Sequence, residues 1–507
     1  MSAKDNLPVP FLDWFELWPG AAGYQPDGRA FIGEFPTGVK LSVQEPEEKR
    51  DFQLPADQPW EGGRADIGTM LHHDGRFRLW YKTTPPGADK TALCYAESDD
   101  GNTWEKPNLG LREFKGSTAN NMLPETLLRE GSIFIDSNPK TPDSERYKMV
   151  FMEGWWKRGG EYMEGLEDEP DALKLRTDLC AQGRSEQEIM EHIGLMGHFK
   201  GAVSPDGFVW TPIEENLLEM FCDSDNIVFF DEEKGRYVGY FRHNMFRETV
   251  PTVWPPNPWR CIGRAETTDF RDWPTPTIVV QPDADEPPTQ DIYTNAYAPY
   301  PGGNYHIMFP SIFHRGTDTV DTQIAVSRNG VSWFRHRDPI LKLGSPEDHE
   351  DGGLYVRHGI FPLDDTHWGV PYICMSARHN EGYYYDPDPN SYYRWAVWQR
   401  DRLIALEAEV EGQVTLLPRV SSGKLVLNCK TGPGGWVRAA FIEPMLWPPE
   451  QIKPIDGFSF EDCEAVRGDE LEAAVRFNGS TDLSALKGRN ICLCLQLCRA
   501  KVFSTLM

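Results

Sequence analysis

A turn that recurs along the chain and always leads into a tryptophan constrains the fold most. The segment Ser98-Asp-Asp-Gly-Asn-Thr-Trp104 recurs as Ser204-Pro-Asp-Gly-Phe-Val-Trp210 and as Ser327-Arg-Asn-Gly-Val-Ser-Trp333, with a degenerate copy at Thr267-Thr-Asp-Phe-Arg-Asp-Trp273. Asp-Gly and Asn-Gly favour tight hairpin turns, and the tryptophan returns onto the sheet to pack beneath the turn. The chain is therefore predicted to repeat one antiparallel β unit.

The spacing of the copies indicates the size of that unit. The last three tryptophans lie 63 and 60 residues apart, whereas Trp104 and Trp210 are separated by 106 residues. The long gap contains a predicted helical insertion at about residues 155–198. Glu, Gln, Leu and Met predominate within it, from about Pro170 to Leu195. A four-stranded sheet of about 40–60 residues, repeated about an axis, is a β-propeller blade.

Five short segments are the predicted inner strands of such blades. They begin near Asp66, Glu130, Asp225, Asp291 and Asp351. Each is followed by a hairpin and a second strand rich in aromatic residues. These second strands cover residues 77–81, 147–152, 237–241, 305–309 and 368–374. The predicted fold is all-β, with a five-bladed β-propeller over residues 51–406; four blades with an extra sheet, or six blades, are the alternatives.

The two ends of the chain differ from this repeat. Residues 1–50 are predicted to be an N-terminal extension that packs on the propeller or on the domain after it. Beyond about Leu406 the aromatic repeat stops, and the segments 423–429, 435–442, 470–477 and 490–497 alternate as half-buried strands. Residues 407–507 are therefore predicted to form a small antiparallel β-sandwich.

Composition excludes several classes of partner. Lys+Arg 51 against Asp+Glu 78 gives a net charge of −27, and a protein that binds nucleic acid or an anionic membrane needs a basic face instead.

No run approaches the roughly 18 apolar residues of a membrane span, and no signal peptide is recognisable, so we expect a cytoplasmic protein, or a secreted one if a leader was removed. There is no Cys-x-x-Cys pair, which fits a reducing compartment. We expect no metal and no cofactor.

The five inner strands all begin at a carboxylate, which indicates where chemistry would occur. In a propeller these strand starts converge on the mouth of the axial funnel. Crowded carboxylates shift one another's pKa, so one can act as an acid while another stays ionised, and glycosidic bond cleavage needs that pairing. The alternative for each position alone is that Asp simply favours strand-entry turns.

Arginine, histidine and tryptophan side chains recur near the same strand ends. Arg-His pairs begin at Arg242, Arg357 and Arg378, and His314-Arg315 has the reverse order. Guanidinium groups hold carboxylate or phosphate, and exposed aromatic rings stack on sugar faces. The residues expected to contact substrate are Arg64, Arg129, Trp155, Trp156, His243, Asp291, Glu350, Asp351, Arg357, His358, Arg378 and His379.

The combination of acid-lined propeller and sandwich resembles the five-bladed glycoside hydrolases of the fructosidase-like family 32 and of family 43. The tail segments Gly457-Phe-Ser-Phe-Glu-Asp-Cys463 and Asp482-Leu-Ser-Ala-Leu-Lys-Gly488 are similar to the sandwich of fructosidase-like proteins. By position, the resemblance implies that Asp66 is the nucleophile or base, Glu130 the transition-state stabiliser, and Asp225 or Asp223 the acid.

The predicted function is hydrolysis of a furanoside or fructoside-like glycosidic bond, with a carbohydrate as the partner and homo-oligomerisation left open. One alternative is a glycoside phosphorylase, in which the Arg-His pairs bind phosphate. Another is a non-catalytic carbohydrate-binding propeller. A sialidase is disfavoured, because five acidic strand starts would repel an anionic sugar.

Overall fold

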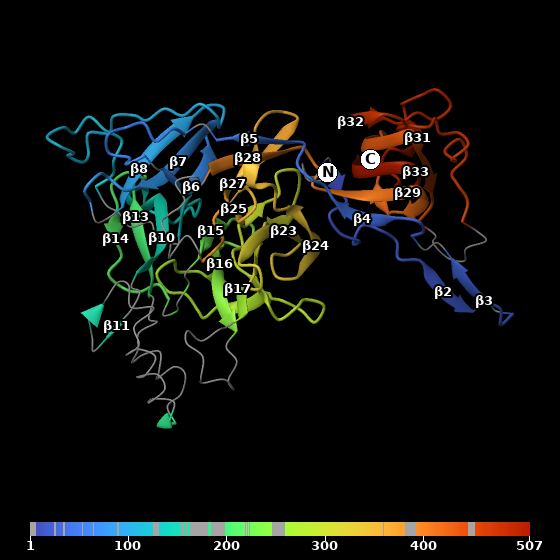
Figure 1. Cartoon of the computed structure of the whole chain (residues 1–507). Helices are drawn as coiled ribbons and strands as arrows, with labels where there is room; N and C mark the ends of the chain where they lie inside the picture. The colour runs from blue at the N-terminus through green and yellow to red at the C-terminus, as the bar shows by residue number, and fades with distance from the viewer. Residues whose placement is uncertain are drawn as a thin grey trace.

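The computed structural model is built almost entirely from antiparallel strands (Figure 1). It describes residues 7–24, 27–33, 36–52, 54–63, 65–88, 91–124, 131–153, 157–158, 161–162, 181–183, 198–218, 220, 222, 224–245, 259–357, 359–380, 392–444 and 452–507. The all-β prediction is confirmed. Most of the predicted helical insertion lies outside the described residues.

Five groups of strands, here called units 1 to 5, make up the region before residue 400. Unit 1 holds β6 (Asp66–His73), β7 (Arg76–Thr83) and β8 (Ala92–Ser98); unit 2 holds β9 (Ser132–Ile135), β10 (Tyr147–Glu153), β13 (His198–Ser204) and β14 (Thr211–Pro212); unit 3 holds β15 (Ile227–Asp231), β16 (Arg236–Met245), β17 (Trp259–Thr267) and β18 (Thr277–Val280). Unit 4 holds β19 (Gln290–Ile292), β20 (Ala298–Pro299), β21 (His306–Met308), β22 (Ser311–His314), β23 (Thr319–Ser327) and β24 (Trp333–Leu341); unit 5 holds β25 (Gly353–Val356), β26 (Phe361–Pro362), β27 (His367–Met375) and β28 (Tyr392–Gln399).

The first strands of the units are the predicted inner strands. β6, β9, β15, β19 and β25 each begin within two residues of the carboxylate that the sequence indicated. β9 lies beside both β6 and β15. The blade number of five stays a prediction, because a parallel contact between Val320 of β23 and Gly353 of β25 joins units 4 and 5 into one 11-stranded sheet.

An N-terminal strand completes unit 5. β5 (Glu48–Asp51) pairs with β28, so the sheet reads β25-β27-β28-β5. Two short strands, β11 (Lys157–Arg158) and β12 (Glu161–Tyr162), pair with each other, and 3-10 helices η2 (Asp143–Glu145) and η3 (Pro346–Asp348) lie in connections.

The recurring turns have one geometry. At the first copy, the Ser98 hydroxyl accepts a hydrogen bond from Gly101 N at 2.9 Å, and Asp100 Oδ1 accepts hydrogen bonds from Asn102 N and Thr103 N, both at 2.8 Å. The same contacts form at the copies beginning at Ser204 and Ser327. The glycine is needed because its φ is positive in each copy, where other residues are strained.

Three of these turns each connect two units. Gly207 O accepts a hydrogen bond at 2.8 Å from the indole of Trp80 in unit 1, and Gly101 O accepts one at 3.0 Å from Trp395 in unit 5. In the third copy the donor to Gly330 O is the phenol of Tyr240 in unit 3, at 2.7 Å. The sequence repeat is therefore a contact between units as well as a hairpin.

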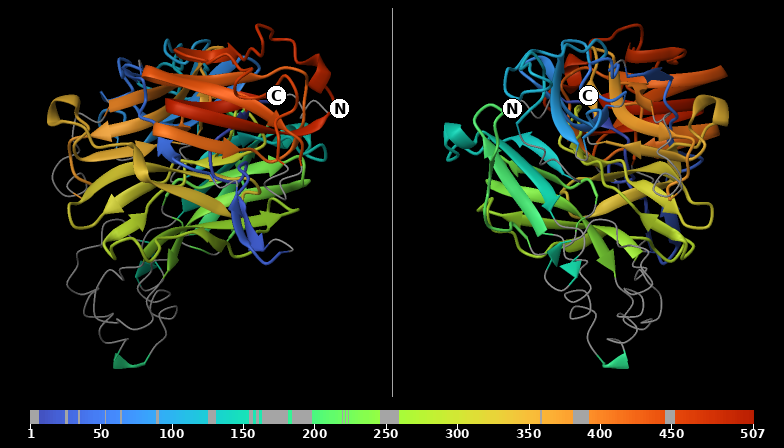
Figure 2. Two further views of the ribbon diagram at one scale, coloured as in Figure 1. Left: turned by 90° about the vertical axis from the view of Figure 1, so that its right-hand side faces the viewer. Right: turned by 60° about the vertical axis from the view of Figure 1, so that its left-hand side comes forward.

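The tail strands form one seven-stranded sheet, whose long members run side by side in Figure 2 (left). Its strands are β1 (Val9–Pro10), β4 (Lys40–Val43), β29 (Ile404–Thr415), β30 (Arg419–Val420), β31 (Val426–Ile442), β32 (Asp469–Ala474) and β33 (Asn490–Leu506), with the 3-10 helix η5 (Ser484–Leu486). The two predicted strands 423–429 and 435–442 are instead one strand, because Gly432 to Gly435 form a bulge within β31 and do not end it.

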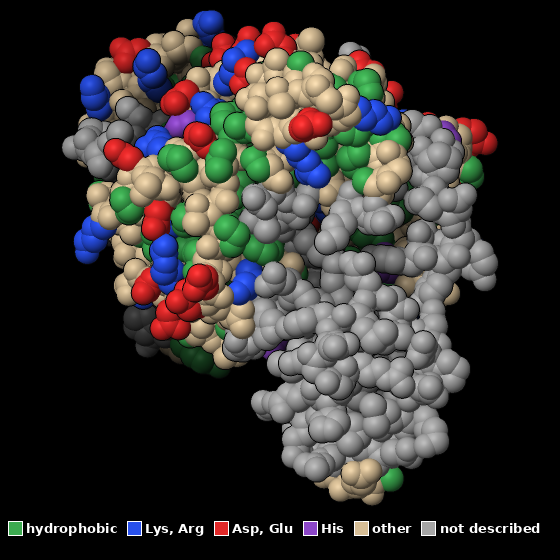
Figure 3. All heavy atoms as spheres, turned by 90° about the vertical axis from the view of Figure 1, so that its left-hand side faces the viewer, with side chains coloured by type: hydrophobic (Ala, Val, Ile, Leu, Met, Phe, Trp, Pro, Cys, Tyr) green, Lys and Arg blue, Asp and Glu red, His purple; other side chains and the backbone are tan. Residues whose placement is uncertain are grey.

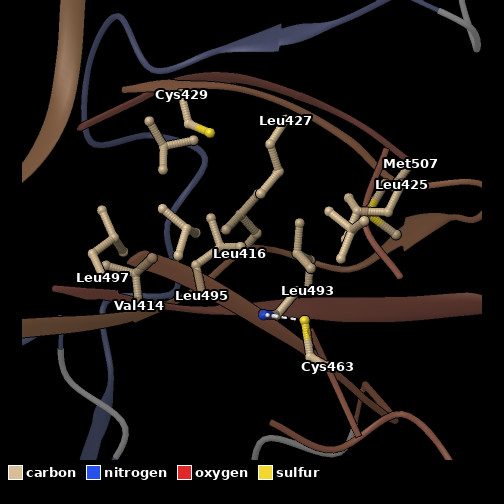
Figure 4. Close-up of a cluster of buried hydrophobic side chains, with 14 of the residues drawn as sticks. Val414, Leu416, Leu425, Leu427, Cys429, Cys463, Leu493, Leu495, Leu497 and Met507 are labelled. Carbon is tan, nitrogen blue, oxygen red and sulfur yellow. Dashed lines mark hydrogen bonds between the residues drawn. The ribbon is translucent and has the colours of Figure 1, made fainter. Parts of the chain in front are cut away.

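The core of the tail is aliphatic. Leu416, Leu427, Leu493 and Leu495 are fully buried within it, as Figure 4 shows, and the Sγ of Cys463 accepts a hydrogen bond from Ala439 N at 3.3 Å. By contrast, the units before residue 400 bury many aromatic rings.

The start of the chain connects the tail to the units. Arg328 in the third recurring turn forms ion pairs with Asp13 at 2.9 Å and Glu16 at 2.5 Å, and Glu16 also pairs with Arg419 of β30. The hairpin of β2 (Ala21–Tyr24) and β3 (Ala30–Gly33) projects beside the tail (Figure 1).

The surface shows mixed charge. On the face drawn in Figure 3, acidic and basic side chains of the described residues intermingle and do not form one basic patch. No helix among the described residues is long and apolar enough to cross a membrane.

Candidate active site at the inner strands

The acids at the strand starts do not share one environment. Four of the five lie in the described residues, namely Asp66, Asp225, Asp291 and Asp351. Two of them are held by arginines, one accepts a hydrogen bond from a tyrosine, and one has a buried oxygen that no described residue contacts through a hydrogen bond. That variety matters, because different environments allow carboxylates to take different roles.

Asp225, just before β15, is fixed by Arg357, just after β25. Arg357 Nη1 donates to Asp225 Oδ1 and Oδ2, both at 2.8 Å. Unit 4 lies between these two strands in the sequence, so this ion pair spans from unit 3 to unit 5. The contact therefore lies where inner strands of non-consecutive units meet, as expected at the axis of a propeller.

Asp291 on β19 is completely buried and holds two arginines. Arg260 donates to it twice, from its backbone N to Oδ1 and from Nη1 to Oδ2, both at 3.1 Å. Arg315, which follows β22, forms an ion pair with the same Oδ2 at 2.6 Å. The sequence predicted Asp291 as a substrate contact, and that stays a prediction: its side chain has no exposed surface, and its ion pairs among the described residues are with these two arginines.

Tyr293 is the centre of the surrounding cluster. Arg242 donates two hydrogen bonds to the Tyr293 carbonyl oxygen, and its guanidinium lies 4.1 Å from the centroid of the Tyr293 ring. Arg260 lies 5.1 Å from the same centroid, and His379 packs edge-on against the ring at 4.7 Å. Arginines from two strands of unit 3 therefore converge on one residue of unit 4.

His379 is held as a neutral ring. Burial, together with the charges of Arg260 and Arg242, lowers its pKa to about 3. Its Nδ1 lies 2.6 Å from the hydroxyl of Tyr355, which extends from β25. The predicted contact residue His379 is thus part of the cluster, and at neutral pH it adds polarity without positive charge.

Asp66 and Asp351 complete the described strand starts. Asp66 is half-buried at the start of β6, where Oδ1 accepts a hydrogen bond at 3.1 Å from the hydroxyl of Tyr393 on β28. Asp351 is half-buried two residues before β25, and its buried Oδ1 accepts no hydrogen bond from the described residues. A buried carboxylate oxygen without a protein partner can accept a hydrogen bond from water or from a ligand.

Glu350, next to Asp351, is fully engaged elsewhere. Its carboxylate receives Tyr372 Oη at 2.6 Å, Arg394 Nη1 at 3.0 Å and Lys49 Nζ at 2.5 Å. Lys49 belongs to β5 and Arg394 to β28, so Glu350 holds the completed sheet of unit 5 together. The geometry gives this predicted substrate contact a structural role.

The other predicted residues divide into two groups. Arg378 is exposed, and His243 is half-buried on the face of β16 opposite Arg242, where burial lowers its pKa. Seven others lie outside the described residues: Arg64, Arg129, Glu130, Trp155, Trp156, Asp223 and His358.

The sequence did not single out four members of this site. Arg260, Tyr293, Tyr355 and Tyr393 lie at or near strand ends, but no motif includes them. Tyr355 and Arg357 are two residues apart, so the alternation of side chains along β25 places them on the same face of the strand. This two-residue spacing is the sequence feature that could have indicated Tyr355.

Within the part of the chain that the structure describes, no group of three or more His, Cys, Asp or Glu side chains is arranged to hold a metal ion. What the cluster offers is carboxylates in unlike environments beside oriented guanidinium groups.

Comparisons with known proteins give a likeness of fold. One glycoside hydrolase structure is 12% identical, with a TM-score of 0.43, over 70% of this chain and 92% of that chain. A thermostable family-43 glycoside hydrolase is 14% identical (TM-score 0.39; 68% and 94% covered), and the GH32 beta-fructofuranosidase of Bombyx mori is 10% identical (TM-score 0.38; 89% and 94% covered). No protein-family model and no curated protein sequence matches the chain.

These descriptions name the two families that the sequence indicated, families 43 and 32. Identities of 10–14% and TM-scores below 0.5 assign neither an activity nor a residue's role. The function proposed below therefore depends on this chain's own side chains.

Proposed function

We propose that the chain is a glycoside hydrolase that cleaves a furanoside or fructoside-like bond with carboxylates at the inner-strand starts. The observation that carries this proposal is the contrast between Asp225 and Asp351. Arg357 engages both oxygens of Asp225, whereas Asp351 keeps a buried oxygen without a hydrogen-bond partner among the described residues. Glycoside hydrolysis needs two carboxyl groups in unlike environments.

The geometry supports a distribution of roles. Asp66, oriented by the Tyr393 hydroxyl, attacks the anomeric carbon or activates a water molecule. Asp351, whose buried oxygen no described residue uses, protonates the leaving oxygen. Asp225, engaged at both oxygens by Arg357, stabilises developing positive charge. This assignment gives the role of acid to Asp351 in place of Asp225 or Asp223. A carboxylate engaged at both oxygens, as Asp225 is, is poorly placed to deliver a proton, and Asp223 lies outside the described residues.

The test is the release of sugar from a panel of furanosides and fructans, with and without inorganic phosphate. Wild type is compared with Asp66→Asn, Asp225→Asn and Asp351→Asn. The control is Asp99→Asn, which removes an exposed carboxylate paired with Arg76 on the surface. Phosphate-independent release that falls at least about 100-fold in Asp66→Asn and Asp351→Asn, and not in the control, supports hydrolysis.

The anomer of the product separates the two courses of hydrolysis. Carboxyl groups about 5–5.5 Å apart give retention, and groups roughly 6.5–9.5 Å apart give inversion. Sugar binding without any turnover, unaffected by all three variants, contradicts the proposal and leaves a binding propeller.

A further inference from the structure

Arg260 is held in one orientation by contacts with three residues. Its Nη1 and its backbone N both donate to Asp291, and its guanidinium lies against the rings of Tyr293, at 5.1 Å, and Phe313, at 5.6 Å. Asp291 is completely buried, so its position is fixed by the surrounding protein. An arginine side chain that is already ordered loses little further entropy when it binds a ligand.

The bracing leaves most of the guanidinium available. Nε and Nη2 of Arg260 donate no hydrogen bond to any described residue, and a quarter of the side chain is exposed. A structural arginine in a protein interior normally uses its donors within the protein. Arg260 therefore presents an oriented, accessible set of donors beside the inner strands.

The neighbours of Arg260 add positive charge. Arg315 shares Asp291 Oδ2 with it, and Arg242 lies over the same Tyr293 ring. In a chain of net charge −27, these three arginines make a local region that favours an anion.

Arginines neutralise the acidic side chains near Arg260 that would otherwise repel an anion. Asp225 is paired with Arg357, and Asp291 with Arg260 and Arg315. The objection that acidic strand starts exclude an anionic ligand therefore does not apply to the side of the cluster formed by units 3 and 4.

We propose that Arg260 binds an oxyanion group of the ligand, with Asp291 and Tyr293 as its positioning residues. The planar guanidinium matches a carboxylate or a phosphate, which accept two parallel hydrogen bonds. Such a group is either a carboxylate on the sugar or an inorganic phosphate that takes the place of water. With a sugar carboxylate as the ligand, this inference deepens the proposed function and depends on it for the identity of the sugar class; with phosphate in place of water, it replaces hydrolysis by phosphorolysis at the same site.

The experiment measures binding by calorimetry on the full chain at low ionic strength. The probes are galacturonate, its neutral counterpart galactose, and inorganic phosphate. The variants are Arg260→Gln and Arg260→Lys. The control is Arg236→Gln, which removes an exposed arginine paired with Glu266 at the far end of the β16–β17 pair.

The expected result is that wild type binds galacturonate or phosphate at least about 10-fold more tightly than galactose. Arg260→Gln abolishes that preference, Arg260→Lys keeps part of it because charge remains without the planar fork, and Arg236→Gln keeps all of it. If Arg260→Gln does not fold, Arg260→Lys alone still tests the claim through a weakened preference.

Different outcomes of the experiment distinguish the two possible sources of the anion. A preference for galacturonate assigns the site to a sugar carboxylate, and phosphate binding with phosphate-dependent turnover assigns it to phosphate. Equal binding of all three probes in wild type, or a preference that survives Arg260→Gln, overturns the inference. Cleavage of a carboxylate-bearing sugar substrate that Arg260→Gln leaves unchanged also overturns this inference while leaving the hydrolase proposal intact. Oxyanion binding that Arg260→Gln removes, without cleavage of any substrate by wild type, supports this inference and contradicts the hydrolase proposal.

Discussion

The recurring turns and the cluster around Tyr293 both join neighbouring units, but by different means. Each turn accepts one hydrogen bond from a neutral aromatic side chain to a glycine carbonyl, and three copies do so at 2.7–3.0 Å. The cluster uses ion pairs instead, and no two of its carboxylates have the same partners. The turns repeat one architectural contact, whereas the strand starts place each carboxylate in a different environment, as distinct catalytic roles would require.

Removing the buried charge of the cluster should have the largest effect on stability. Asp291→Ala leaves Arg260 and Arg315 facing each other without their shared carboxylate, and breaking a buried pair costs about 3–5 kcal/mol. Denaturant unfolding measures this change in the free energy of unfolding. Arg236→Gln, which breaks an exposed pair, is expected to cost no more than about 1 kcal/mol. Similar losses in both variants would contradict the buried role of Asp291.

The turns are tested by a pair of glycines. Gly207 and Gly235 both have positive φ, at 82° and 64°, so alanine is strained at either position. A Cβ at Gly207 would also lie 2.8 Å from a Trp80 side-chain atom and 3.1 Å from a Tyr147 side-chain atom. A Cβ at Gly235 would have no neighbouring atom within 4 Å. Gly207→Ala should therefore destabilise the chain by about 1–3 kcal/mol more than Gly235→Ala, the cost of overpacking. Equal melting temperatures would show that this turn is not a close contact between units.

Acid should weaken the cluster through His379. Its pKa is about 3 in the folded chain and about 6.5 when unfolded, so the unfolded state binds the proton more readily between these values. Stability from this residue is complete above pH 6.5 and falls as the pH decreases towards 3, by about 2 kcal/mol at pH 5. The free energy of unfolding of His379→Gln should depend less on pH over this range. An unchanged pH dependence would mean that His379 is not held neutral.

The hydroxyl of Tyr393 should matter least for stability and most selectively for activity. Tyr393→Phe removes a hydrogen bond to Asp66 and is expected to cost about 1 kcal/mol or less. If that hydroxyl orients the nucleophile or base, kcat falls about 10-fold while KM changes little, and the pH profile of kcat shifts. A change in KM alone would assign Tyr393 to substrate binding.

The fold was predictable where one residue type imposes one backbone geometry. Gly101, Gly207 and Gly330 have positive φ, and the serine and the Asp or Asn before each of them form the same hydrogen bonds. The same residue types therefore recur in each copy, and the repeat can be recognised in the amino-acid sequence. The inner strands followed from that spacing. The bulge in β31 was not predictable, because Gly-Pro-Gly-Gly is equally suited to a turn between two strands.

The site was less predictable because its contacts join residues far apart in the sequence. Asp225 meets Arg357 and Asp66 meets Tyr393, and nothing local in the chain indicates either partner. Glu350 and Asp351 are adjacent acids, yet one is engaged by three donors and the other keeps a buried oxygen without a hydrogen bond to any described residue. Strand alternation separates them, but only the packing of β5 and β28 explains why Glu350 is the structural one.

The central claim is that the unlike carboxylates at the strand starts cleave a glycosidic bond. Its most direct measurement is kcat/KM of Asp351→Asn on the best furanoside of the panel, together with its melting temperature. We expect a loss of at least about 100-fold with a melting temperature close to that of wild type, because the buried Asp351 Oδ1 accepts no hydrogen bond from the described residues. Full activity in a folded Asp351→Asn protein would contradict it.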